Sequence, residues 1–165
     1  MTKVGVILGS GSDWPVMEPG WRLLEDFGVP AEVVVASAHR TPDAVREFAS
    51  SARERGFGVI IAVAGMAAHL PGVVASFTTL PVVGVPASGS ALKGMDALLS
   101  VAQMPSGVPV GTMAIDGGKN AALYAVSILA ITNEELARRL LNFRDAQAEE
   151  VRERDRALRE KIKKE

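Results

Sequence analysis

The sequence predicts a doubly wound parallel β-sheet with helices on both faces. Short apolar runs rich in β-branched residues alternate five times with helix-like segments, and the connections between them are short. This alternation is typical of βαβ units, in which a helix joins successive parallel strands. The chain has 165 residues, which is enough for a substantial core and suggests a single domain spanning residues 1–165.

Five apolar runs are predicted to be the strands of this sheet. Gly, Pro or polar residues bound each run, and the third is continuously apolar, as expected of a strand covered on both faces. The predicted strands are residues 3–8, 31–36, 59–63, 81–86 and 108–115.

Helix signals occupy the segments that follow the strands. Gly28 fits the position after the first helix, and Thr41 can cap the second. Pro19 and Gly20 lie inside the first helix, where they are expected to kink or fray it. The predicted helices are residues 14–27, 42–55, a short one after residue 72, 92–102, 117–131 and a last one that runs to about residue 151.

The last helix is expected to begin at residues 132–135, which have the spacing of a capping box. An apolar stripe follows, and beyond Val151 most residues are charged, with opposite charges three or four positions apart that support an exposed helix. We expect residues 133–165 to be a C-terminal helix that either frays at its end or packs on a neighbouring subunit, because its apolar stripe needs a covering surface.

Composition excludes several classes of protein. A formal net charge of −1 gives no support for nucleic-acid binding, and the absence of cysteine excludes disulfides and thiolate metal sites. Two histidines make a His-rich metal site unexpected. No apolar run reaches the roughly 18 residues of a membrane span, and no signal peptide is visible. We therefore expect a cytoplasmic protein without a membrane partner.

The segment SAHRTP, residues 37–42, combines two hydroxyls, His39 and Arg40 where a strand passes into a helix. Ligands bind at that edge of open α/β sheets. Histidine moves protons near neutral pH, and arginine binds phosphate or carboxylate with two hydrogen bonds. Both side chains could instead be merely solvated, and the loop alone does not decide. The helix dipole nevertheless disfavours an arginine at a helix N-terminus. Its presence there favours an anion that is shared between Arg40 and the helix.

Two Gly-rich loops follow the first and third strands. In residues 9–13, Ser10 and Ser12 can donate to an anion and Asp13 can accept from ribose hydroxyls, although a simple turn with Asp13 as a helix cap is also compatible. His69 lies in a loop of small residues that suits either a flat ligand or tight packing. Together, the three loops suit a sugar phosphate and one proton-transferring group.

Several motifs, in order and spacing, resemble the class I 5-(carboxyamino)imidazole ribonucleotide mutases of purine biosynthesis, the PurE family. SAHR followed by AAHLPG resembles class I rather than the class II carboxylases, which use carbon dioxide. The motifs are GSGSDW at 9–14, SAHRTPD at 37–43, AAHLPG at 67–72, LPVVGVP at 80–86 and QMPSGVPVGT at 103–112.

The resemblance implies a three-layer α/β/α domain of flavodoxin-like type, with an extended C-terminal helix, that assembles as a homo-octamer and uses no metal and no organic cofactor. It implies an isomerase that moves a carboxylate from the exocyclic nitrogen of the aminoimidazole to the ring carbon, giving 4-carboxy-5-aminoimidazole ribonucleotide. His39 would be the general acid and base. One imidazole can serve both directions because it titrates near neutral pH.

The resemblance also assigns the binding residues. Ser10 and Arg40 would hold the phosphate, Asp13 the ribose hydroxyls, and the loop of residues 65–70 the base and the migrating carboxylate. Besides the catalytic His39, the implied substrate-binding residues are Gly9, Ser10, Ser12, Asp13, Ser37, Ala38, Arg40, Gly65, Met66, Ala67, Ala68, His69 and Leu70.

The chain differs from the family pattern at Met66 and Val63, where the family usually has glycine. If residue 66 requires a positive φ, Met66 is strained by roughly 1–2 kcal/mol. Two alternatives to the mutase therefore stay open, namely a carboxylase that uses free carbon dioxide and a non-catalytic nucleotide-phosphate binding module. A flavin carrier is less favoured, because aromatic residues are scarce.

Overall fold

The computed structural model describes residues 2–163 and contains a five-stranded, fully parallel sheet. The strand order is β2-β1-β3-β4-β5, so the predicted doubly wound sheet is confirmed. The strands are β1 (Lys3–Leu8), β2 (Ala31–Val35), β3 (Phe57–Gly65), β4 (Val82–Ala87) and β5 (Gly111–Thr112).

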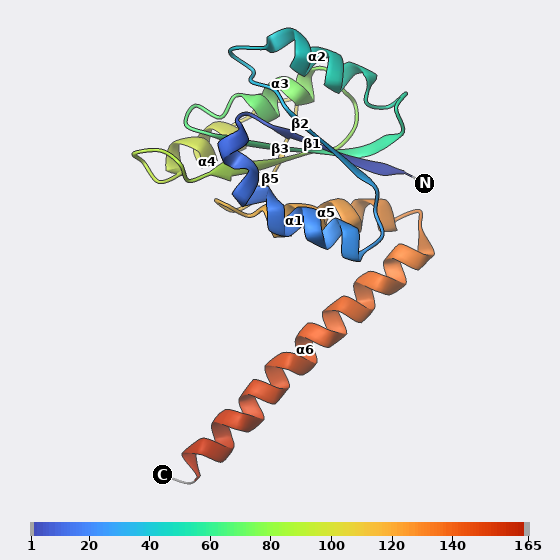
Figure 1. Ribbon diagram of the computed structural model, residues 1–165, viewed down its shortest axis with the longest axis vertical. Coiled ribbons are helices and arrows are strands. Elements are labelled where there is room, and N and C mark those ends of the chain that lie inside the picture. The colour runs from blue at the N-terminus through green and yellow to red at the C-terminus, as the bar shows by residue number, and fades with distance from the viewer. Residues whose placement is uncertain (1, 164–165) are drawn as a thin grey trace. The chain divides into compact units, whose positions relative to one another are not determined.

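Helices cover both faces of this sheet (Figure 1). Residues of α2, α3 and α4 share one buried cluster with strand residues, and α1 and α5 lie on the other face. The helices are α1 (Trp14–Asp26), α2 (Pro42–Ser51), α3 (Leu70–Ser76), α4 (Met95–Ala102), α5 (Gly118–Ala130) and α6 (Glu134–Ile162), and a short 3-10 helix, η1 (Gly11–Asp13), precedes α1.

The strand order creates a switch point between β1 and β3. From β1 the chain moves outward to β2 and then returns to β3 on the other side, so the loops after β1 and β3 diverge. Leu8, at the end of β1, is in register with Val35 on one side and Val63 on the other. Such a crevice at the carboxyl ends of parallel strands is the usual ligand site of this architecture.

Apolar spacing in the sequence accounts for the core. Val45, Phe48 and Ala49 stand at helical positions i, i+3 and i+4 of α2, and all three are buried. The central strand β3 is buried along most of its length because helices cover both of its faces. Val63, one of the two departures from the family pattern, lies fully buried inside this strand.

Helix α1 is continuous through Pro19 and Gly20, so the expected fraying is wrong. Pro19 removes a single N–H from the helix, and Gly20 permits close contact with α5. A Cβ atom at Gly20 would overlap the carbonyl oxygen of Gly118, and one at Gly118 would overlap the carbonyl of Val16. The two glycines therefore allow the backbones of α1 and α5 to touch.

Strand β5 is much shorter than the predicted residues 108–115. Pro109 has no N–H to donate to a ladder. Beyond Thr112 the regular pairing with β4 is interrupted. The N–H of Met113 donates to the carbonyl of Gly84, and the N–H of Asp116 donates to the carbonyl of Pro86. The chain after β5 thus advances by three residues while β4 advances by two. The extra residue ends the strand.

Local turns displace two helix boundaries from their predicted positions. Helix α2 ends at Ser51 rather than residue 55, because turns occupy the residues up to Gly56, which has φ 82°. Helix α4 begins at Met95 rather than residue 92, after a turn in which Lys93 and Gly94 both have positive φ. In each case the local turn displaced the boundary that periodicity alone suggested.

Helix α6 is a single helix of 29 residues, so the predicted C-terminal helix over residues 133–165 is confirmed as far as Ile162, well beyond the apolar stripe. Its N-cap is Asn133, whose side chain accepts from the N–H of Leu136, and not Thr132 as the capping-box pattern suggested. The charged tail does not fray up to Ile162, and it carries the expected ion pairs, such as Glu150 with Arg154. Residues 164–165 of the predicted segment lie outside the described residues. The chain divides into two compact units after Leu129.

No helix among residues 2–163 combines the length and hydrophobicity of a bilayer span.

An ion cluster joins β1, β2 and the end of the α2 region. Glu32 accepts hydrogen bonds from Lys3 and Arg55, whose cations also lie over the ring of Phe57. Burial raises the pKa of Glu32, but the hydrogen bonds from Arg55 and Lys3 outweigh it and leave the pKa below its usual value. Because the carboxyl pKa is lower in the folded chain than in the unfolded chain, the cluster stabilises the fold fully at pH values above the pKa of the unfolded chain. This stabilisation is lost as the pH falls through the pKa of the folded chain.

Replacing Glu32 by Gln is expected to lower the free energy of unfolding by about 0.5–1 kcal/mol at neutral pH, the range for partly exposed ion pairs. The difference from the unmodified chain should shrink below about pH 4, where the carboxyl is protonated in both states. Urea unfolding at neutral and acidic pH measures both effects. Glu18→Gln, in a more exposed pair with Arg22, is the control. An equal deficit at both pH values would contradict the assignment.

Candidate active site

A cavity of about 740 Å³ opens at the carboxyl edge of the sheet. The loops after the first four strands surround it, and every residue that the sequence analysis assigned to the site lines it. Those residues are Gly9, Ser10, Ser12, Asp13, Ser37, Ala38, His39, Arg40, Gly65, Met66, Ala67, Ala68, His69 and Leu70.

Five lining residues were missed by the sequence analysis. Val16 and Ala64 carry no polar group, so nothing in their side chains distinguishes them from core residues. Ala87, Ser88 and Gly89 follow β4 and form a fourth wall. The signal for this wall was available, because a Ser-Gly-Ser segment follows the fourth strand just as the other polar loops follow theirs.

The loop after β1 is organised around Ser10 and Asp13. The carboxylate of Asp13 accepts from the N–H of Ser10 at 2.9 Å, and the hydroxyl of Ser10 accepts from the N–H and hydroxyl of Ser12 at 3.2 and 2.8 Å. These bonds form a capping box for η1, while the Asp13 side chain makes no capping bond to α1. Burial raises the pKa of Asp13, and the Ser10 N–H partly offsets this.

The loop after β2 is closed by hydrogen bonds between Ser37 and Thr41. The Thr41 hydroxyl accepts from the N–H of Ser37 at 2.9 Å and donates to its carbonyl at 3.2 Å. Thr41 is the N-cap residue of α2, as predicted, but its side chain makes no capping bond, since this hydroxyl is used within the loop. Arg40 donates through its backbone N–H and Nε to the hydroxyl of Ser37, at 3.3 and 3.4 Å.

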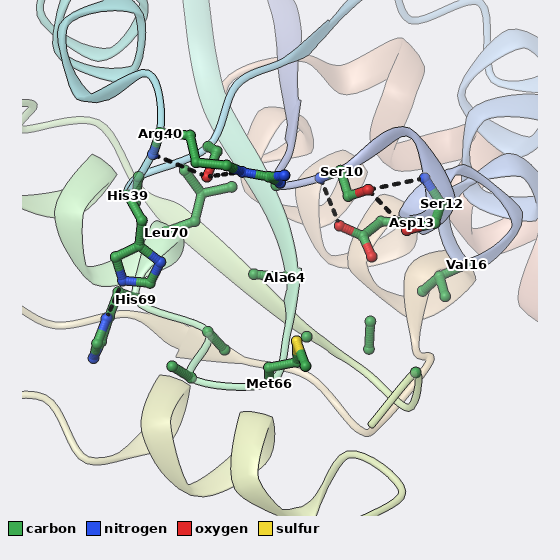
Figure 2. A pocket seen from close by; sticks show the side chains of 18 of the residues that line it. Ser10, Ser12, Asp13, Val16, His39, Arg40, Ala64, Met66, His69 and Leu70 are labelled. Atoms are coloured by element: carbon green, nitrogen blue, oxygen red, sulfur yellow. Dashed lines mark hydrogen bonds between the residues drawn. The ribbon is translucent and has the colours of Figure 1, made fainter. Parts of the chain in front are cut away.

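The guanidinium of Arg40 extends across the cavity toward Ser10 (Figure 2). It thus brings a permanent positive charge close to a loop that offers hydroxyl groups. An anion between the two loops could accept from both sides, with charge-assisted bonds from the arginine. The arrangement suits a phosphate better than a neutral group.

On the other side of the cavity the rings of His39 and His69 meet. Nε2 of His39 lies 2.6 Å from Nδ1 of His69, and the ring planes are inclined by 81°. One of these two nitrogens must donate a hydrogen and the other accept it. The pair can therefore hold a proton between two bases, with Nδ1 of His39 and Nε2 of His69 left for other partners.

The loop after β3 contains a strained turn. The N–H of Ala68 donates to the carbonyl of Gly65 at 3.0 Å, and Met66 inside this turn has φ 56°. The predicted condition for strain at Met66 is thus met, and Ala68 also has a positive φ of 41°. The hydroxyl of Ser100 donates to the carbonyl of Ala67, which ties the loop to α4. Met66 is 65% exposed and stands at the cavity wall (Figure 2).

The cavity thus combines an anion-binding side, a histidine pair and walls of small residues. Ala64, Gly65, Ala67 and Ala68 leave room for a flat ring close to the backbone. Within residues 2–163, no three or more His, Cys, Asp or Glu side chains converge in a geometry that could hold a metal ion. These groups suit a phosphorylated planar compound and a proton-transfer step.

Comparisons with known proteins give a consistent result. The family model described as "AIR carboxylase" matches residues 3–150. An N5-carboxyaminoimidazole ribonucleotide mutase of Pyrococcus horikoshii is 54% identical over 157 residues, which cover 95% of this chain and 89% of that protein. A protein of the same name from Thermotoga maritima is 52% identical over 158 residues, covering 96% of this chain and 92% of that protein.

The fold is shared with a solved structure. A crystal structure of Treponema denticola PurE superposes with a TM-score of 0.84 at 26% identity, and the match covers 94% of this chain and 97% of that one. The three-layer, flavodoxin-like architecture is therefore common to both proteins.

Replacing Met66 by Gly is expected to relieve the backbone strain at φ 56°. Replacing it by Ala removes the same side chain beyond Cβ but keeps the strain. The Gly variant should therefore be more stable than the Ala variant by about 1 kcal/mol, the lower end of the cost of a left-handed L-residue. Denaturant unfolding of the two variants measures the difference. A more stable Ala variant would show that the turn does not strain Met66.

Proposed function

The chain belongs to the AIR carboxylase family, and we propose that it acts as an N5-carboxyaminoimidazole ribonucleotide mutase. The reaction moves the substrate's carboxylate from the exocyclic nitrogen to the ring carbon and gives 4-carboxy-5-aminoimidazole ribonucleotide. The observation that carries this proposal is a single cavity that joins Arg40 and the Ser10 loop with the His39–His69 pair. The activity would take place in the cytoplasm.

The anion-binding side would hold the ribonucleotide. Arg40 and Ser10 would donate to the phosphate, and Asp13 would accept from the ribose hydroxyls. The raised pKa of Asp13 agrees with a carboxylate that loses water contacts on one side of a cavity and needs donors. The base would then lie against the small residues of the loop after β3.

The proton balance of the reaction requires only one group. His39 would give a proton to the exocyclic nitrogen as its bond to the carboxylate breaks, which releases carbon dioxide and neutral aminoimidazole ribonucleotide. The ring carbon would then attack the carbon dioxide, and His39 would take back the proton that this carbon carried. One proton is given and one is taken, so the enzyme ends as it began.

The histidine contact supports this role for His39. When His39 is protonated, its Nε2–H can donate to Nδ1 of His69 at 2.6 Å, and a charge-assisted bond of this kind stabilises the charged ring. Its Nδ1–H would then face the substrate. After the proton has moved, the neutral ring can accept again at the same atom. His69 would therefore keep the reacting nitrogen oriented.

Replacing His39 by Asn is expected to reduce turnover by about 10²- to 10⁴-fold, which is the usual contribution of general acid–base catalysis. Substrate affinity should change little, because the phosphate contacts remain. Turnover assays with N5-carboxyaminoimidazole ribonucleotide, together with binding by calorimetry, separate the two quantities. Arg40→Ala is the matched contrast and should weaken binding by about 1.5–3 kcal/mol. Near-normal turnover of the Asn variant would refute the assigned role.

The principal rival is direct carboxylation of aminoimidazole ribonucleotide by free carbon dioxide. Isotope-labelled bicarbonate distinguishes the two reactions, because a mutase transfers the carboxylate that its substrate already carries. With unlabelled substrate in labelled bicarbonate, we expect little label in the product during the first turnovers. Product labelled in proportion to the solution label would favour the carboxylase. Tight binding without any product would favour a non-catalytic binding module.

We also propose a homo-oligomer, an octamer by family resemblance. Exposed apolar side chains recur along α6, at Leu141, Val151, Leu158 and Ile162, each more than half exposed. Burying them against another copy would release water from apolar surface. Light scattering should therefore give a mass several times that of the 165-residue chain. A monomer at micromolar concentration would contradict this proposal.

A further inference from the structure

The cavity wall formed by Ala87, Ser88 and Gly89 is hydrogen-bonded to a residue that does not line the cavity. Asp116 follows β5 and does not line the cavity itself, yet it makes two hydrogen bonds to the end of β4. Its backbone N–H donates to the carbonyl of Pro86 at 2.8 Å, and its carboxylate accepts from the N–H of Ser88 at 2.9 Å. Asp116 therefore binds the residues on both sides of Ala87, where β4 ends and the cavity wall begins.

Asp116 makes these two hydrogen bonds in an unusual backbone conformation. Asp116 has φ 57°, which few residues other than glycine adopt, although aspartate and asparagine tolerate it better than most. The positive φ coincides with the extra residue that interrupts the pairing after Thr112. Strained residues persist where the surrounding contacts determine them, and they are common near functional sites.

Neighbouring contacts restrict the same loop on its far side. The hydroxyl of Ser90 donates to the carboxylate of Asp96 in α4 at 2.8 Å. A Cβ at Gly94 would lie 2.7 Å from Ile115 and 3.1 Å from the Cα of Ser88, so the loop lies tightly against the residues after β5. Gly89 therefore lies between a residue bonded to Asp116 and a residue bonded to Asp96.

We propose that Asp116 is a positioning residue that keeps the Ser88–Gly89 wall closed, so that carbon dioxide released within the cavity is recaptured by the ring carbon. The inference rests on the proposed mutase activity. Carbon dioxide is small and uncharged, so no ion pair can retain it, and only enclosure can. The fraction that escapes depends on how well each wall stays in place.

The experiment measures how much carbon dioxide escapes from the cavity. The full chain and two variants, Asp116→Gly and Asp116→Asn, are given unlabelled substrate in isotope-labelled bicarbonate, and labelled product and free aminoimidazole ribonucleotide are counted per turnover. Glycine accepts the positive φ but lacks the carboxylate. Asparagine tolerates the same φ, and its amide oxygen can still accept from the Ser88 N–H, while the charge is lost. The asparagine variant therefore separates geometry from charge.

We expect the Gly variant to raise the labelled fraction and the released aminoimidazole ribonucleotide by about 2- to 10-fold, the worth of one hydrogen bond. The Asn variant should stay close to the unmodified chain. A Gly variant that loses no more carbon dioxide than the unmodified chain would overturn the inference. An Asn variant that loses as much carbon dioxide as the Gly variant would also overturn it. Urea unfolding of each variant shows whether it is folded.

A second variant keeps the inference testable if Asp116→Gly does not fold. Ser88→Pro removes the donor of the same hydrogen bond from the cavity side and should also increase leakage; unchanged leakage in a folded Pro variant would overturn the inference. Failure of the proposed function is visible separately in the unmodified chain. If that chain makes no product, or if its product carries the full solution label, the mutase proposal fails. If it transfers its own carboxylate and the variants do so equally well, only the role of Asp116 fails.

Discussion

The pairing of β1 with both β2 and β3 is the constraint on which the site depends. Because these three strands are parallel and in register at Leu8, Val35 and Val63, their carboxyl ends meet at one edge of the sheet. Loops separated by almost thirty positions in the sequence are thereby brought to a common cavity, and His39 contacts His69. No single loop contains the site, and the hydrogen-bonded sheet is what assembles it.

The same edge carries the backbone strain of the molecule. Among residues 2–163, the non-glycine residues with positive φ are Met66, Ala68, Lys93 and Asp116. All four lie in loops that follow β3, β4 or β5. Met66 and Ala68 line the cavity, whereas Lys93 and Asp116 do not, and the conformational energy that these turns cost is offset by the buried core.

Sequence reasoning was most successful where a pattern had a local cause. The alternation of apolar runs and helical segments predicted the fold, and the loops after three strands, together with the family resemblance, predicted most of the cavity lining. It failed where individual hydrogen bonds decide. Thr41 is the N-cap residue of α2, but its hydroxyl bonds to Ser37 and not to the helix, and β5 ends early because of an added residue opposite β4. The wall after β4 was missed although its serine and glycine residues are of the same kinds as those in the loop after β1.

The contact between α1 and α5 has a consequence for how substitutions would be tolerated. Gly20 and Gly118 lie away from any ligand group, yet α1 follows the loop that holds Ser10, and α5 begins two residues after Asp116. A methyl group at either glycine would push α5 away from α1, the helix that carries the lining residue Val16. Neither glycine lines the cavity, and a side chain at either position would act on the spacing between the two backbones.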